Sequence, residues 1–253
     1  MRRPVKLTPA GVFWIGYLLA LVVGGLLCFR NAAAADIPPA AQKHRADLTR
    51  NARAVWGLDA PVATFAGQVH QESRWRPDAI SPVGAQGIAQ FMPATADWIA
   101  EAYPALAARQ PFNPGWGLRA LVTYDRHLWE RVKAASACDR MAMTLSAYNG
   151  GLGWVWRDQK LAASQGADSA RWFDQVERYN AGRHAAAFRE NRGYPRLILR
   201  TFEPRYVAAG WGQGSCPLGT MPAPLIRQGR VSGVRSAKRL AHKHRNQRRA
   251  RHA

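Results

Sequence analysis

One glutamate in this chain is placed where a side chain could do acid–base chemistry. Glu72 comes shortly after an apolar run, residues 62–69, that reads as a buried helix. A carboxyl group at the end of a buried helix loses part of its hydration, and its pKa then rises toward the range that suits a general acid near neutral pH. Glutamates at helix ends more often cap the helix or pair with a surface cation, so this position alone does not establish catalysis.

The segment between Glu72 and Pro93 has the composition of a loop that approaches a ligand. Pro93 opens a new helix, because proline is favoured in a first helical turn. Before it, residues that break helices and permit tight turns recur, at Pro77, Pro82, Gly84 and Gly87. Because glycine lets the backbone come close to a ligand, this loop can carry binding groups toward Glu72.

Three blocks of sequence occur in a fixed order along the chain. They are Glu72-Ser73 with Ser81-Pro82-Val83-Gly84-Ala85 and Gly87-Ile88-Ala89-Gln90-Phe91-Met92-Pro93, then Ala147-Tyr148-Asn149-Gly150-Gly151, then Glu190-Asn191-Arg192-Gly193-Tyr194. Together they resemble the motifs of lytic transglycosylases with a lysozyme-like domain, the group of soluble lytic transglycosylases and goose-type lysozymes. The resemblance covers residues 61–211. It departs at Ala89, where the family usually has methionine, and this puts the fit of one subsite in question.

The resemblance implies a mainly α, lysozyme-like single catalytic domain that cuts peptidoglycan glycan strands without a metal or cofactor. In that family one glutamate protonates the β-1,4 oxygen between N-acetylmuramic acid and N-acetylglucosamine, then deprotonates the muramyl C6 hydroxyl, which closes a 1,6-anhydro ring. Carried over to this sequence, Glu72 is that acid and base. Tyr194 would hydrogen-bond near Glu72, and Glu190 would hold helices together. The substrate-binding candidates are Ser81, Gln90, Tyr148, Asn149 and Tyr194.

Two other functions fit the same residues. A hydrolytic muramidase on the same fold would use water as acceptor, and Asp78 is the acid nearest in sequence that could orient it. A catalytically silent wall-binding protein would instead rely on the basic residues at the carboxyl end. The product of the reaction separates the first rival from a transglycosylase, and a zymogram separates the second.

Helices are expected throughout the body of the chain. The spacing of apolar residues predicts helices at 41–56, 61–72, 93–106, 113–132, 141–148 and 191–210, with Asp139 as a cap of the fifth. Residues 154–189 look less regular, and no strand pattern or repeat is evident, so the class is mainly α. We expect a signal or anchor at 1–35, a linker and first helix at 36–60, the lysozyme-like domain at 61–211, and a disordered tail at 212–253, rich in Gly and Pro and then in Arg and Lys.

The amino end carries a signal of export. The run Gly11–Phe29 is uncharged and apolar, follows a basic head, and precedes an Ala33-x-Ala35 site with cleavage expected before Asp36. It fits either a cleaved signal peptide or a retained membrane anchor, which needs about 20 residues. Either reading takes the protein out of the cytoplasm, to the periplasm or cell envelope.

The charge balance favours an anionic partner. Lysine and arginine outnumber acidic residues by 36 to 16, and ten of these basic residues lie from Arg227 onward, where there is no acid. The tail could bind an anionic wall polymer or a membrane surface, or it could be a solvated extension without a partner. Nucleic acid is not expected, because that role conflicts with export.

Two cysteines and several aromatic residues complete the prediction. Without the signal, Cys138 and Cys216 remain, and two cysteines in an exported protein predict a disulfide. Trp98 is expected to face inward. The aromatic residues at 154, 156, 172 and 173 could line a sugar groove or fill a core. Tyr179-Asn180 repeats part of the second block, but its charged flanks make it a poor buried helix end.

Overall fold

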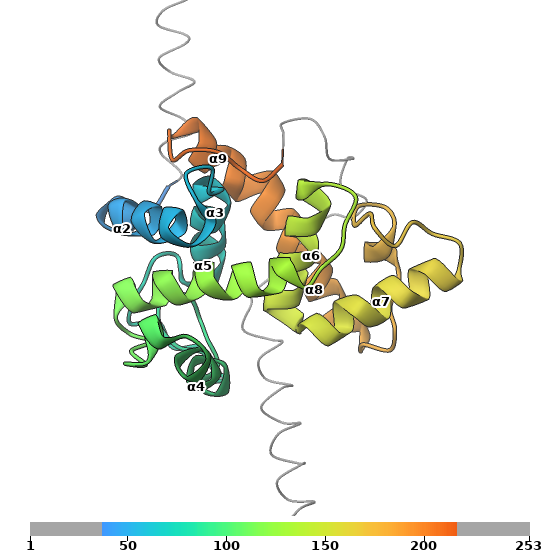
Figure 1. The fold of residues 1–253 in the computed structure, drawn as a ribbon, viewed down its shortest axis with the longest axis horizontal. Helices are drawn as coiled ribbons and strands as arrows, with labels where there is room; N and C mark the ends of the chain where they lie inside the picture. Colours follow the sequence, from blue (N-terminus) through green and yellow to red (C-terminus); the bar gives the residue numbers. More distant parts are fainter. Residues whose placement is uncertain (1–36, 217–253) are drawn as a thin grey trace, which may run out of the picture.

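A computed structural model describes residues 37–216, and this part of the chain consists of helices and loops (Figure 1). The helices are α2 (Pro39–Trp56), α3 (Val62–Ser73), α4 (Pro93–Ala102), η1 (Pro104–Leu106), α5 (Pro114–Glu130), α6 (Ala137–Gly150), α7 (Leu152–Ser164), η2 (Val176–Arg178), α8 (Ala185–Leu197), η3 (Ile198–Phe202) and α9 (Glu203–Ala208). Over the same residues β pairing is limited to isolated bridges, Ile80 with Gln86 and Gln86 with Phe91. The predicted mainly α class is confirmed.

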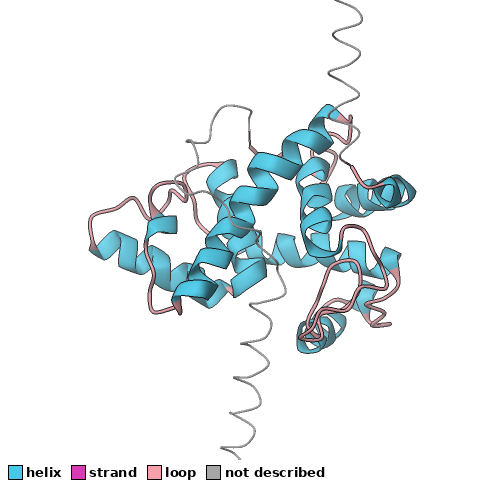
Figure 2. Ribbon diagram, turned by 180° about the vertical axis from the view of Figure 1, so that it is seen from behind, coloured by secondary structure: helices cyan, strands magenta, loops and turns pink. Residues whose placement is uncertain are grey.

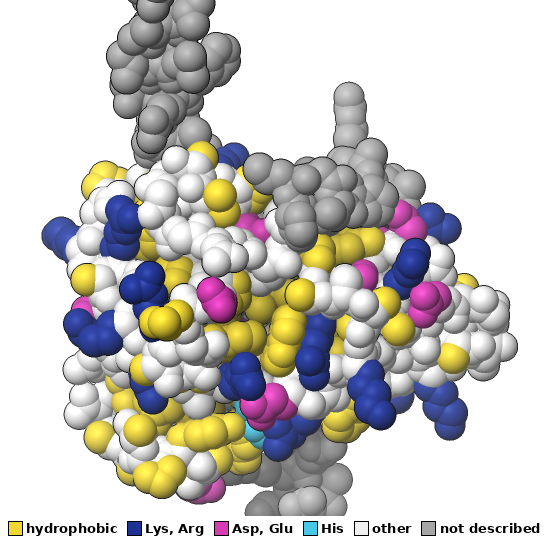
Figure 3. Space-filling model, turned by 45° about the horizontal axis from the view of Figure 1, so that its top comes forward, with side chains coloured by type: hydrophobic (Ala, Val, Ile, Leu, Met, Phe, Trp, Pro, Cys, Tyr) yellow, Lys and Arg dark blue, Asp and Glu magenta, His cyan; other side chains and the backbone are white. Residues whose placement is uncertain are grey.

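The predicted amino-terminal segment 1–35 and residues 217–253 of the predicted tail 212–253 lie outside the described residues. Within residues 37–216, no helix combines the length and apolar character that crossing a bilayer requires. On the face drawn in Figure 3, lysine and arginine side chains stand apart from one another, with hydrophobic side chains between them.

The helices form two groups that α5 connects (Figures 1 and 2). One group contains α2, α3 and α4, and the other contains α6, α7 and α8. Helix α2 packs on α3 and α5, and α6 packs on α5, α7 and α8. The run from α8 through η3 to α9 returns to the first group, because η3 and α9 both pack on α3.

Helix α3 is the buried centre of the domain. All eight residues from Val62 to Val69 are buried, as expected for a helix that is covered on every side. Gly67 lets α3 and η3 pack closely, since a Cβ at this position would lie 3.0 Å from the Cβ of Phe202 in η3. The predicted apolar helix that leads to Glu72 is therefore present.

Helix α5 contributes a long apolar face to the core, where it packs on α2 and α6. It begins at Pro114 behind the cap of Asn113, whose Oδ1 accepts from the backbone N–H of Trp116 at 3.2 Å. Its buried residues include Leu118, Leu121, Val122 and Leu128. Helix α6 begins earlier than predicted, because Ser136 caps it by accepting from the N–H of Asp139 at 3.0 Å.

The region 154–189 is more helical than predicted. Helix α7 occupies Leu152–Ser164 and buries Val155, Asp158 and Ala162 along one side. Asp158 interrupts the apolar pattern of that side, so the spacing of apolar residues did not predict this helix. The predicted helix 191–210 begins earlier, at Ala185, and changes to a π-helical turn at Ile198–Phe202 before α9.

Candidate active site

Glu72 lies in the last turn of α3, where the chain reverses sharply. Arg74 and Trp75 both have positive φ, 54° and 67°, which is unusual for residues other than glycine. The side chain of Trp75 is fully buried, and its Nε1 donates to the Tyr206 hydroxyl at 2.6 Å. This anchor offsets the cost of the turn and fixes the direction in which the chain leaves Glu72.

A tyrosine from α8 reaches Glu72 directly. The hydroxyl of Tyr194, which is completely buried, donates a hydrogen bond to Glu72 Oε1. Burial raises the pKa of Glu72 to about 8; the Tyr194 hydrogen bond opposes this rise, and the charge of Glu190 adds to it. The carboxyl group is therefore mostly protonated at neutral pH and can act as an acid.

A second carboxyl group, Asp125 of α5, lies behind the first. It is fully buried, and its Oδ1 accepts from Gln68 Nε2 at 3.3 Å, one turn before Glu72 in α3. Burial holds the pKa of Asp125 well above its usual range, and the nearby charge of Glu72 raises it further. Burial of Asp125 therefore disfavours a negative charge next to Glu72.

The prediction from sequence missed Asp125, although the sequence contained a signal for it. Asp125 falls three and four residues from Val122 and Leu121, on the face of α5 that is otherwise apolar. A lone acid at such a position is forced into the core, where it is either paired or protonated.

The loop after Glu72 is shaped by two of the predicted substrate-binding residues. Ser81 Oγ accepts from the backbone N–H of Ala85 at 2.9 Å, closing a turn. Gln90 has a positive φ of 51°, and its Nε2 donates to the carbonyl oxygens of Ala79 at 3.0 Å and Gly87 at 2.8 Å. Both side chains therefore hold the loop in shape.

Glycine is required at position 87 of this loop. Its φ is +73°, and a Cβ there would lie 1.7 Å from the carbonyl oxygen of Pro111. The loop can pack against residue 111 only because Gly87 has no side chain. Ser73 Oγ also donates to the carbonyl oxygen of Ile88 at 2.8 Å, which ties the loop to the end of α3.

The second block stands at the carboxyl end of α6. Tyr148 donates its hydroxyl to the carbonyl oxygen of Ala89 at 2.8 Å, so it holds the loop from the opposite side. Asn149 Oδ1 accepts from Asn191 Nδ2 at 3.1 Å. Of the predicted site residues, Tyr194 therefore contacts Glu72 directly. Tyr148 contacts the loop that contains Ser81 and Gln90. Asn149 contacts Asn191 of the third block.

The two cysteines predicted to pair are joined in the structure. The disulfide links Cys138, at the start of α6, to Cys216 after α9. The same segment is held by Glu203, whose carboxylate accepts from the backbone N–H groups of Ser215 and Cys216, each at 3.1 Å. Residues 212–216, which were predicted to begin a disordered tail, are therefore instead fastened to the domain as far as Cys216.

The aromatic residues divide between core and surface. Trp172 is fully buried, as a core residue would be, whereas Trp156 is half exposed. Trp98 was expected to face inward, but its side chain is 38% exposed. It packs edge-on against Tyr103, Tyr124 and His127, so only part of its ring is covered. Asn180 closes a local turn through its bonds to the backbone of Arg183.

Comparison with known proteins assigns the family. Residues 53–173 match the family described as Transglycosylase SLT domain. The chain belongs to the transglycosylase SLT family. The match includes Glu72, its loop and the end of α6, whereas Tyr194 lies beyond it. Among curated SLT relatives, the chain is 28% identical over 218 residues to a membrane-bound lytic murein transglycosylase F of Vibrio cholerae, covering 78% of this chain and 38% of that protein.

A second relative gives the same picture. The chain is 31% identical over 189 residues to membrane-bound lytic murein transglycosylase F 1 of Alkalilimnicola ehrlichii, covering 67% of this chain and 36% of that protein. The chain therefore spans less than two fifths of the length of these SLT relatives.

Proposed function

We propose that this chain is a lytic transglycosylase of peptidoglycan in which Glu72 is the single general acid and base. The observation that carries the proposal is the hydrogen bond from the buried Tyr194 hydroxyl to the Glu72 carboxyl group, in surroundings whose desolvation raises the pKa of Glu72 to about 8. A protonated carboxyl group can give its proton to a glycosidic oxygen as the bond breaks. The SLT family and its murein-cleaving relatives support peptidoglycan as the substrate.

The proposed reaction needs no water. Glu72 protonates the oxygen between N-acetylmuramic acid and N-acetylglucosamine, the bond from that oxygen to the muramyl C1 breaks, and the glucosamine sugar leaves as an alcohol. Tyr194 donates to the carboxylate that remains. The carboxylate then takes the proton of the muramyl C6 hydroxyl, and the C6 oxygen bonds to C1 to form the 1,6-anhydro sugar. The nucleophile belongs to the substrate, so its proximity accelerates ring closure.

The environment of Glu72 favours this route over hydrolysis. A hydrolytic glycosidase usually needs a second ionised carboxylate, as nucleophile or as base toward water. Asp125 is fully buried, which raises its pKa and disfavours its ionised form, and Glu190 is only 9% exposed, so neither is suited to that role. Asp78, the acid that a muramidase could use, is exposed on the loop.

The remaining predicted residues complete the proposal. Tyr148 and Asn149 bind the glycan strand at the end of α6, and Ser81 and Gln90 contribute by holding the loop that faces it in shape. We also propose that the protein acts in the cell envelope, where residues 11–29 serve as a cleaved signal or an anchor. Cell fractionation with sequencing of the mature amino end would separate the two, and a full-length protein found in the cytoplasm would contradict both.

The decisive experiment compares the wild-type protein with Glu72→Gln on purified peptidoglycan. The amide keeps the shape of the side chain and cannot give up a proton in the same way, so turnover should fall about 10²–10⁴-fold in a folded protein. Mass spectrometry of the products should find anhydro-muramyl ends, which are lighter by one water molecule than reducing ends. Reducing ends would favour the muramidase, and near-normal clearing by the variant would remove Glu72 from the mechanism.

A further inference from the structure

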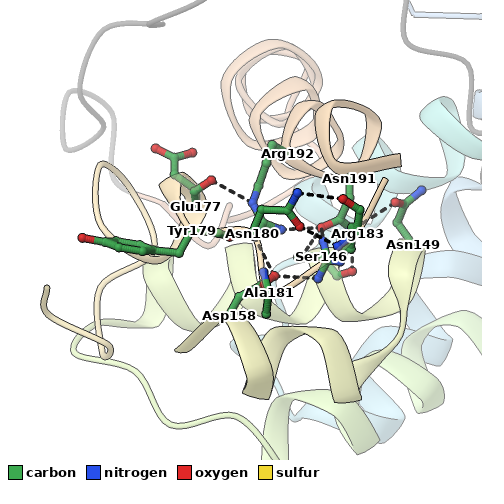
Figure 4. A network of polar contacts seen from close by, with 10 residues as sticks. All are labelled: Ser146, Asn149, Asp158, Glu177, Tyr179, Asn180, Ala181, Arg183, Asn191 and Arg192. Atoms are coloured by element: carbon green, nitrogen blue, oxygen red, sulfur yellow. Dashed lines mark hydrogen bonds and ion pairs between the residues drawn. The ribbon is translucent and has the colours of Figure 1, made fainter. Parts of the chain in front are cut away.

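A buried ion cluster lies behind the third block (Figure 4). Asp158 Oδ2 accepts from Arg183 Nη2 at 2.7 Å and from Arg192 Nη2 at 2.6 Å. All three side chains are almost completely removed from solvent. Because two guanidinium groups share one carboxylate, the cluster has N–H groups left to donate to another acceptor.

That acceptor is the amide oxygen of Asn191. Its Oδ1 accepts from Arg183 Nη1 and from Arg192 Nη1, the latter at 2.6 Å, and from Ser146 Oγ at 2.8 Å. A guanidinium group can only donate, so the atom that faces it must be the oxygen of the amide. The amide nitrogen points the other way and donates to the carbonyl oxygen of Ser146 at 2.8 Å, and a carbonyl oxygen can only accept. Both ends of the Asn191 amide are thus fixed by groups that have no alternative role.

The orientation of Asn191 decides the orientation of Asn149. Asn191 Nδ2 offers only hydrogens, so the atom of Asn149 that meets it at 3.1 Å must be the oxygen. The Asn149 amide nitrogen then points away from the cluster, as Figure 4 shows. Asn149 is half-buried at the end of α6, next to Tyr148, so this outward N–H₂ group is the part of the side chain left to bind a ligand.

A glycine makes the contact possible. A Cβ at Gly150 would lie 2.7 Å from Asn191 Nδ2, closer than real Cβ atoms come to other heavy atoms. The sequence Asn149-Gly150 therefore combines the oriented amide with the space that its partner needs.

We propose that Asn191 is a positioning residue that fixes Asn149 as a hydrogen-bond donor toward the glycan, so that Asn149 can meet a group that only accepts, such as the carbonyl oxygen of an N-acetyl substituent. This inference rests on the proposed function. A sugar hydroxyl both donates and accepts, so it would bind either orientation of the Asn149 amide. An N-acetyl carbonyl oxygen only accepts, so its recognition requires an amide whose orientation is fixed.

The test uses two glycan substrates and two variants. The substrates are purified glycan strands, either N-acetylated or chemically N-deacetylated so that an ammonium donor replaces the carbonyl acceptor. Asn149→Asp keeps the oxygen that accepts from Asn191 and replaces the outward donor with a carboxylate oxygen. It should lower kcat/KM on the N-acetylated strand by about tenfold or more, because a site built for one hydrogen-bond polarity rejects the other. It should raise the relative rate on the deacetylated strand.

Asn191→Asp tests the positioning role. One carboxylate oxygen still accepts from the arginines, while the other now faces Asn149 and requires a donor, so the Asn149 amide should rotate and present its oxygen to the glycan. The ratio of rates on the two strands should move in the same direction as in Asn149→Asp. Circular dichroism and a thermal melt establish that each variant is folded. If Asn191→Asp does not fold, Asn191→Ser serves instead, since serine is too short to hold Asn149 and the substrate preference should weaken.

The outcomes separate this inference from the proposed function. If the wild-type protein cleaves neither strand, the proposed function fails. If it cleaves the N-acetylated strand but both folded variants lose activity equally on the two strands, Asn191 and Asn149 are structural residues and the inference is overturned. Unchanged preference in Asn149→Asp would overturn the claim that Asn149 is a donor.

Discussion

Replacing Glu72 by glutamine should stabilise the protein at neutral pH although it lowers turnover about 10²–10⁴-fold. The pKa of Glu72 is about 8 in the folded protein and 4.5 is its ordinary value, so the unfolded chain releases a proton that the folded state keeps. Each pH unit above 4.5 therefore costs the folded state about 1.4 kcal/mol, which reaches about 3 kcal/mol at pH 7. Glutamine removes this cost and its oxygen still accepts from Tyr194.

The effect has a distinct dependence on pH. Below about pH 4.5 the carboxyl group is protonated in both the folded and the unfolded state, so the variant and the wild type should be equally stable. The advantage of the variant should grow from there to pH 8 and then level off. At pH 7 an advantage of about 3 kcal/mol corresponds to a melting temperature about 6–12 °C higher for a domain of this size.

Differential scanning calorimetry at pH 4.5, 6, 7 and 8 would measure this difference. Glu101→Gln, on the exposed end of α4, is a matched control, since an exposed carboxyl group should give no comparable dependence. If Glu72→Gln were no more stable than the wild type at pH 8, Glu72 would be ionised in the folded protein. It could then not be the acid of the proposed reaction.

Three further predictions concern the loop, the disulfide and the tail. Gly87→Ala should lower both the melting temperature and wall clearing, because its Cβ would meet a carbonyl oxygen at 1.7 Å; a normally active variant would show that the loop is packed differently. Breaking the bond between Cys138 and Cys216, which closes 78 residues, should cost about 4 kcal/mol in a melt with reductant, and free thiols in the exported protein would contradict the pairing. Truncation after Ala223 should weaken co-sedimentation with wall at low salt but leave cleavage of a short soluble glycan unchanged; equal sedimentation would show that the tail has no wall partner.

The helices that the sequence predicted best are those whose burial is simple. Helix α3 is apolar on every side and α5 has one long apolar face with an Asn-Pro start, so periodicity and capping were sufficient to find them. Helix α7 was missed because a buried acid, Asp158, stands among its inward residues. Two arginines, from positions 183 and 192, and the backbone N–H of Ala181 make that position tolerable, and their proximity is a property of the fold.

The candidate site shows the same limit. The motifs identified Glu72 and Tyr194, and in the structure the Tyr194 hydroxyl donates a hydrogen bond to Glu72. They did not predict that Ser81 and Gln90 hydrogen-bond to the backbone of their own loop, because that depends on left-handed residues and on the packing of Gly87. They also gave no role to Asn191, because that role depends on the position of its amide between two arginines and Asn149.

One buried carboxyl group is sufficient for the proposed chemistry because the same desolvation serves both steps. Removal of water makes the protonated form of Glu72 the stable one at pH 7, so the proton is present when the glycosidic oxygen needs it. Once the proton has been given up, the carboxylate is poorly solvated and has a high affinity for a proton, which makes it an effective base toward the C6 hydroxyl. Burial raises the pKa of Asp125 as well, which disfavours a second negative charge that would weaken the acid in the first step. The Tyr194 hydrogen bond stabilises the carboxylate between the steps and keeps its pKa near the working pH, where neither transfer is strongly uphill.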